Sequence, residues 1–175
     1  MVKVGSDCHH APGGESFQQA MGVIYNLVYT TKFRAKEVLK KDYDVLALEG
    51  LWWAKGRGFA LTNPERWLWS LMIVVPDFVD ERLFTESVEA VRHRKNPPGL
   101  EKARLETLDE GTAVQVMHIG PYSAEPASIA KMGAYAREHG FRLVGKHHEI
   151  YLGDPRRAAP SKLKTILRHP VARAA

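Results

Sequence analysis

The segment Trp67 to Val75 (WLWSLMIVV) constrains the fold more than any other part of the chain, because Ser70 is its only hydrophilic side chain. Successive side chains of a β-strand point to opposite faces of the sheet, so a strand of this composition is expected to be buried on both faces. Such a strand lies inside a sheet, and the sheet needs a cover on each side. Pro76 follows and is expected to end the strand.

A long amphipathic helix is predicted ahead of this strand and can supply part of the cover. Apolar residues recur at helical spacing from Phe17 to Leu39, Ser16 is a candidate N-cap, and the Lys40–Asp42 cluster ends the pattern. Two more helices are predicted over Asp80–Lys95, which stops before a Pro-Pro-Gly break, and from Ala124 or Pro126 to His139, which Gly140 closes.

The remaining strands are predicted over Tyr43–Trp53, Ala103–Leu108, Thr112–Ile119, His147–Leu152 and Lys162–His169. Asp109–Gly111 separates two of them and predicts a hairpin turn, and Pro170 is expected to end the last one.

A faint internal repeat organises these elements. Each half of the chain has a long helix, a short strand with a central glutamate (Glu49 or Glu149), and a strand followed by proline. The fold class we expect is α+β: a single domain, 1–175, of two strand-helix-strand-strand modules at about 1–100 and 101–175. Their strands would form a mostly antiparallel sheet with helices on one face and a ligand cavity on the other.

Composition excludes several classes of protein. Hydrophobic residues make up 45% and charged residues 26%, as in globular proteins, and no stretch reaches the ~18 apolar residues of a membrane span. The N-terminus has no apolar segment typical of a signal peptide, so a cytoplasmic location is expected. The net charge of +5 is spread along the chain, with no basic run longer than Arg92–Lys95, so neither nucleic acid nor a membrane is an expected partner. Cys8 is the only cysteine, and Cys8-His9-His10 has no further ligand at a suitable spacing, so no metal and no cofactor is expected.

The most informative polar residues lie on the predicted strand from His147. Alternation places His147, Glu149 and Tyr151 on one face. Ile150 and Leu152 share the other face and are expected to meet the helices, which leaves Glu149 on the open side of the sheet.

Aromatic residues are expected beside this acid. Trp67 and Trp69 share a face of their strand, and Glu49 lies on the face opposite Trp52. An aromatic hollow with a buried carboxylate suits flat or cationic organic molecules. The alternative is that Glu149 pairs with an arginine or lysine and that the tryptophans only fill a core.

Several segments together resemble the stand-alone GyrI-like proteins. They are YDVLALEGLWW, WLWSLMIVVPDFV, VMHIGPYSAEPASI and above all GKHHEIYLGDPRRAAPSKLKTILRHPV. The resemblance implies two modules around a pseudo-two-fold axis, with Met1–Gly5 as a short version of the family's first strand. It also implies a cavity with an acid on its floor, here Glu149, that meets cationic aromatic molecules.

The stand-alone branch is similar to cyclopropanoid cyclopropyl hydrolases, which add water to the strained ring of DNA-alkylating natural products and so detoxify them. The resemblance therefore implies Glu149 as general base, with Tyr122 or Tyr151 donating a hydrogen bond to Glu149 or to the carbonyl oxygen of the substrate. The expected ligand-binding residues are Glu49, Trp52, Trp67, Trp69 and His147.

Two other functions remain open at this point. With no helix-turn-helix ahead of the domain, a module that only sequesters hydrophobic aromatic or cationic small molecules is the main alternative to the enzyme. A partner that inhibits a topoisomerase rests on the family's name alone. An exposed sheet edge at Met1–Gly5 could promote a homodimer or be covered by the N-terminal tail.

Overall fold

The computed structural model describes residues 1–6, 14–54 and 67–174 and separates into two compact units. Unit 1 consists of Met1–Ala47 and Trp69–Leu108, and unit 2 of Leu48–Leu68 and Asp109–Ala175. Each unit combines antiparallel strands with helices, so the predicted α+β class is confirmed. Neither unit is continuous in sequence. Strand β2 (Leu48–Ala54), from the first half of the chain, belongs to unit 2, and strand β4 (Ala103–Leu105) belongs to unit 1.

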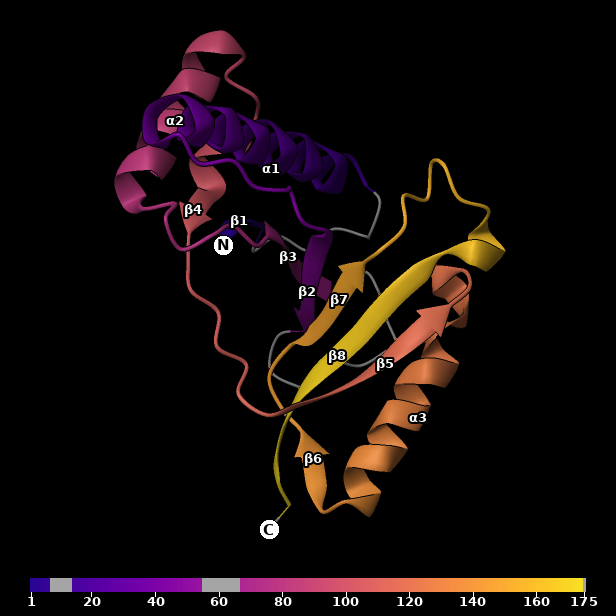
Figure 1. Ribbon diagram of the computed structural model, residues 1–175. Coiled ribbons are helices and arrows are strands. Elements are labelled where there is room, and N and C mark those ends of the chain that lie inside the picture. Colours follow the sequence, from indigo (N-terminus) through magenta and orange to yellow (C-terminus); the bar gives the residue numbers. More distant parts are fainter. Residues whose placement is uncertain (7–13, 55–66, 175) are drawn as a thin grey trace. The chain divides into compact units, whose positions relative to one another are not determined.

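In unit 1 the N-terminal strand β1 (Val2–Ser6) is the centre of a three-stranded ladder. It pairs antiparallel with β3 (Trp67–Ile73) on one side and with β4 on the other (Figure 1). β1 is therefore not the exposed edge that the sequence suggested. Residues 68–73 of β3 are all buried, which confirms that this strand is covered on both faces.

Two helices cover the apolar side of unit 1. Helix α1 (Glu15–Arg34) continues through the π-helical turn η1 (Ala35–Leu39) and ends at Lys40, whose φ of 56° is left-handed. Its N-cap is Gly14 rather than Ser16, and no side chain caps it. Helix α2 (Glu81–Arg94) contacts α1, and the carboxylate of Asp80 caps it by accepting the N–H of Leu83 at 2.8 Å.

The prediction of a strand from Tyr43 is wrong, since β2 begins at Leu48. The intervening residues are tied to the helix layer of unit 1 instead. The carbonyl of Tyr43 accepts a hydrogen bond from Lys32, its ring meets Phe78 edge-on at 5.8 Å, and Asp42 forms an ion pair with Lys32 at 2.8 Å. These side-chain contacts, rather than pairing with a neighbouring strand, hold Asp42 and Tyr43 in place.

Unit 2 is built on four antiparallel strands in the order β2-β7-β8-β5, with β7 at His147–Tyr151, β8 at Lys164–Arg173 and β5 at Ala113–Ile119 (Figure 1). A short strand β6 (Phe141–Leu143) pairs with the far end of β8. Helix α3 (Glu125–Glu138) packs on this sheet and forms a core of Ile129, Met132, Leu167, Val114 and Val116.

Two strand predictions in the second half are also wrong. The expected hairpin does not form, because β4 pairs with β1 while β5 pairs with β8. The N–H of Glu106 donates to the carbonyl of Met1 at 3.0 Å, which directs the chain after β4 along unit 1. β8 does not end at Pro170: β7 pairs with it only as far as Arg168 and β6 joins at Val171, so the missing N–H of the proline falls where β8 changes partners.

None of the helices within the described ranges is both long and apolar enough to cross a membrane. The Cys8-His9-His10 segment lies outside these ranges.

Candidate functional site

The register of unit 2 decides which face Glu149 occupies. Glu149 lies directly across from Gly50 of β2 and from Leu167 of β8, and residues opposite each other in a ladder share a face. Leu167 packs against α3, so Glu149 lies on the α3 side of the sheet. The expectation of an open face was wrong because Ile150 faces Ile166 on the other side and Leu152 is exposed, so neither residue marks the helix-covered face.

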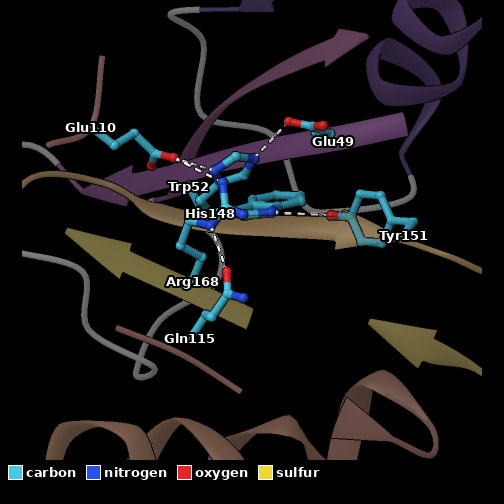
Figure 2. Close-up of polar contacts among 7 residues, drawn as sticks. All are labelled: Glu49, Trp52, Glu110, Gln115, His148, Tyr151 and Arg168. Atoms are coloured by element: carbon cyan, nitrogen blue, oxygen red, sulfur yellow. Dashed lines mark hydrogen bonds and ion pairs between the residues drawn. The ribbon is translucent and has the colours of Figure 1, made fainter. Parts of the chain in front are cut away.

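Glu149 is a buried carboxylate that accepts a hydrogen bond from a tyrosine. It is 8% exposed, and the hydroxyl of Tyr151 donates to its Oε2 at 2.7 Å. The indole N–H of Trp52 donates in turn to the Tyr151 oxygen at 3.2 Å (Figure 2). Nε2 of His147 lies 3.4 Å from Oε1 of Glu149. Among the described residues no lysine or arginine forms an ion pair with Glu149, in contrast to the alternative left open by the sequence.

Gly50 provides the space for this hydrogen-bond relay, which runs from Trp52 through Tyr151 to Glu149. A Cβ atom at residue 50 would lie 2.8 Å from the Tyr151 oxygen and 2.9 Å from Nε1 of Trp52, closer than such contacts allow. The absence of a side chain at this position, directly opposite Glu149, lets the two aromatic donors approach the strand.

We therefore expect Gly50→Ala to displace the Tyr151 hydroxyl and break its bond to Glu149. Overpacking of this kind destabilises a protein by about 1–3 kcal/mol. Thermal unfolding measures the loss, and a shift in tyrosine and tryptophan near-UV circular dichroism reports the displaced rings. Gly22→Ala, where a Cβ meets nothing within 4 Å, is the matched control. An unchanged near-UV spectrum for Gly50→Ala would contradict the expectation.

Further aromatic rings surround the relay in unit 2. Tyr122 meets Tyr151 edge-on at 6.0 Å, and Trp67 meets Trp52 edge-on at 5.9 Å. Burial and the charge of Glu149 raise the pKa of Tyr151 well above its usual range, so its hydroxyl keeps the proton that it donates. Trp69, the remaining predicted tryptophan, belongs to unit 1, where it is buried against Phe17 at 5.2 Å.

Glu125 is a second acid at this face that the sequence did not single out. It is the first residue of α3 and only 6% exposed, and its Oε1 has no hydrogen-bond partner within the described part of the chain. Burial and repulsion by Glu149 raise its pKa to about 8, although a hydrogen bond with Thr165 works in the opposite direction. The sequence predicts a helix that begins at Ala124 or Pro126, so Glu125 falls in or next to its first turn, where acidic residues are usually exposed to solvent. The hydrophobic pattern of the helix therefore gave no indication that Glu125 is buried.

Three buried histidines, His147, His169 and His118, also lie on this face of the sheet. His147 is fully buried, with its ring 5.7 Å from that of His169. Burial and the charge of His147 lower the pKa of His169 to about 4, so His169 is neutral at pH 7. The ring of His118 hydrogen-bonds the Ser128 hydroxyl at 3.0 Å and the Pro121 carbonyl at 3.1 Å, which fixes the turn η4 (Tyr122–Ala124) that leads into Glu125.

The opposite face of the sheet has its own polar network, and it includes Glu49 (Figure 2). Glu49 hydrogen-bonds Nε2 of His148 at 2.9 Å, and Glu110 hydrogen-bonds Nδ1 of the same ring at 2.8 Å. The structure thus brings Tyr122, Tyr151, Trp52, Trp67 and His147 together with Glu149 and places Glu49 across the sheet from them.

The expected cavity remains a prediction. The two best-defined hollows among the described residues, of about 470 and 500 Å³, are surface grooves of unit 1, and no residue of this site lines them. Residues 55–66, which lie between Trp52 and Trp67 in the sequence, are outside the described ranges.

Comparisons with known proteins agree with the α+β fold described above. The family model of the GyrI-like small molecule binding domain matches residues 77–172. An uncharacterized conserved protein from Listeria innocua is 38% identical, with a TM-score of 0.88 over 98% of this chain and 88% of that protein. A hydrolase from Listeria innocua is 35% identical, with a TM-score of 0.84 over 98% and 87%. The C-terminal domain of EcmrR is 14% identical, with a TM-score of 0.56 over 99% and 92%, and shares the fold alone. No curated protein in the comparison is significantly similar.

Proposed function

This chain belongs to the GyrI-like family of small-molecule binding domains, and from that premise we propose that it hydrolyses the cyclopropane of genotoxic cyclopropanoid compounds. The observation that carries the proposal is the buried carboxylate of Glu149, which is held by Tyr151, flanked by His147 and surrounded by aromatic rings, with no lysine or arginine paired to it among the described residues. The hydrolase from Listeria innocua, at 35% identity, supports a hydrolytic reaction.

A cyclopropane conjugated to a dienone is already a strained electrophile. The enzyme therefore needs to orient the substrate and water and to transfer protons, rather than to make the ring more electrophilic. Water attacks the ring CH2, the carbon–carbon bond breaks, and its electron pair makes the six-membered ring aromatic and leaves a negative charge on the former carbonyl oxygen. Glu149 takes the proton of the attacking water as a general base.

The two tyrosines have different roles in this proposal. Tyr151 orients Glu149, because its hydroxyl proton is already committed to Oε2. The Tyr122 hydroxyl has no hydrogen-bond partner among the described residues, and its side chain is 39% exposed. It would donate a hydrogen bond to the carbonyl oxygen as negative charge develops there.

The aromatic rings and His147 would bind the planar substrate. Trp52 and Trp67 form the edge-on pair next to Tyr151, and His147 flanks Glu149. Trp69, which is buried in unit 1, has no role in this proposal. Glu49 is bonded to His148 across the sheet and has no role in this proposal.

Binding without catalysis is the second candidate function, favoured by the family's description as a small-molecule binding domain. A sequestering protein would hold hydrophobic aromatic or cationic molecules against the same rings, and Glu149 would supply the negative charge.

One experiment separates these functions. The protein is incubated with a cyclopropane-bearing dienone alkylator in water enriched in ¹⁸O, and the product is followed by mass spectrometry with tryptophan fluorescence measured in parallel. Hydrolysis predicts catalytic formation of a ring-opened alcohol that carries ¹⁸O. Saturable quenching with recovery of intact alkylator would contradict hydrolysis and establish sequestration.

A further inference from the structure

A second carboxyl group accompanies Glu149 on the α3 side of the unit 2 sheet, and the mechanism above does not use it. Glu125 hydrogen-bonds Thr165, and Thr165 lies directly across the β7–β8 ladder from Tyr151, the residue that holds Glu149. With 6% of its surface exposed and Oε1 without a partner among the described residues, Glu125 has a buried oxygen that its neighbours do not satisfy.

The two carboxyl groups repel each other when both are ionised. Nearby buried acids therefore hold one proton between them over a wide pH range. Burial and the charge of Glu149 raise the pKa of Glu125 to about 8, so Glu125 carries that proton at neutral pH. Within the described part of the chain, the other titratable groups coupled to it electrostatically are Tyr151 of β7 and Tyr122 of η4, whose pKa values are both raised, so both stay neutral.

Resting on the proposed hydrolysis, we infer that Glu125 is a second catalytic residue, which delivers its proton to the oxygen that ring opening leaves negatively charged. A buried carboxylic acid with an unsatisfied oxygen, at the start of the helix that covers this face, is suited to meet the substrate from the side opposite the strand.

The proton balance closes without any added reagent. Water forms a carbon–oxygen bond to the ring CH2 and gives its proton to Glu149, while Glu125 protonates the new phenolate oxygen. The site is then left with Glu149 protonated and Glu125 ionised. Passage of one proton from Glu149 to Glu125 restores the starting state, and the net reaction is addition of one water molecule.

The test compares wild type with Glu125→Gln, which keeps the size of the side chain and its capacity to bond Thr165 but carries no transferable proton. We expect the single-turnover rate of ring opening to fall about 100-fold, the scale of general acid catalysis. The wild-type rate should decrease as the pH rises through about 8, where Glu125 loses its proton, and this decrease should be absent in Glu125→Gln.

A substrate series separates a catalytic role from a structural one. In analogues whose product phenol is more acidic, the developing oxyanion needs less help, so the loss caused by Glu125→Gln should shrink along the series. An equal loss with every analogue, or a wild-type rate and pH profile in the variant, would overturn the inference while leaving the hydrolysis intact. A wild-type protein that forms no ring-opened product would reject the hydrolysis and this inference together.

Discussion

Replacing Glu149 by glutamine should lower the rate of cyclopropane opening by about 1,000-fold, within the range that a positioned general base contributes. The amide has the size of the carboxyl group, and its oxygen can still accept the hydrogen bond from Tyr151, so the surrounding packing should be preserved. What the variant loses is the ability to take a proton from the attacking water. The measurement is the single-turnover formation of ring-opened product at pH 7.

Binding and catalysis should separate in the same variant. Tryptophan quenching by a neutral, non-reactive analogue should give a dissociation constant close to that of wild type, because the aromatic rings are untouched. Glu138→Gln, which removes a charge from the exposed last residue of α3, is the matched control and should react at the wild-type rate. Near-normal turnover by Glu149→Gln would reject the assignment of the base.

Tyr151→Phe should have a smaller effect, about 10-fold, because it removes one hydrogen bond that orients Glu149 and leaves the base itself in place. It also leaves the indole N–H of Trp52 without its acceptor. The rate of Tyr151→Phe should depend on pH in the same way as the wild-type rate, because the base is still present but less well oriented, whereas loss of the base would change the shape of the pH profile. A loss as large as that of Glu149→Gln would contradict this positioning role.

The shared face of His147, Glu149 and Tyr151 followed from the sequence because alternation within one strand is a local property. The structure confirms the strand, and the contacts of Glu149 with the other two residues confirm their common face. Which face the helix covers is not local. It depends on the register that sets Leu167 of β8 across from Glu149, and a single strand contains no information about its partner.

The same limit explains the larger errors. Ala103–Leu108 and Thr112–Ile119 have hairpin spacing, but β4 has its partner at the N-terminus of the chain and β5 has its partner near the C-terminus. Pattern analysis favours neighbours in sequence, whereas these ladders join segments about 50 to 100 residues apart. Glu125 was missed for a related reason, since the burial of a first-turn acid is set by β8 and β7 rather than by its own helix.

His148, the neighbour of Glu149, carries the second large effect, on stability rather than on chemistry. Both ring nitrogens face carboxylate oxygens, Glu110 at 2.8 Å and Glu49 at 2.9 Å, and only the charged imidazolium has an N–H for each (Figure 2). Burial alone would lower the pKa of His148, but the hydrogen bonds and charges of the two glutamates raise it. Arg168 adds a weaker contact, 3.5 Å from the same Glu110 oxygen.

We expect His148→Leu to destabilise the protein by about 3–5 kcal/mol, the cost of removing one partner from a buried ion pair and leaving the other charges uncompensated. For a chain of this size that corresponds to a fall of about 10 °C in Tm. Ile150→Leu, a conservative change on the same face and strand, should cost less than about 1.5 kcal/mol and is the matched control.

The pH dependence identifies the cause of the loss. Because the folded-state pKa of His148 is raised, its contribution is complete below the unfolded value near 6.5 and disappears as the pH rises through the folded value. Burial is the largest single influence on the pKa of Glu110 and raises it, but the hydrogen bonds and charges of His148 and Arg168 together lower it below its usual value. The contribution of Glu110 therefore exists above the unfolded value near 4.5 and disappears as the pH falls through the folded value. The gap in Tm between wild type and His148→Leu should therefore be widest between about pH 4.5 and 6.5.

A compensating variant tests the same argument from the side of the carboxylates. If the cost of His148→Leu comes from uncompensated charge, adding Glu49→Gln and Glu110→Gln should recover part of the lost stability, although each change alone in the wild-type background should be destabilising. A cost that comes only from packing predicts no recovery and a gap in Tm that does not vary with pH. Either of those results would show that His148 is held by shape rather than by its two acids.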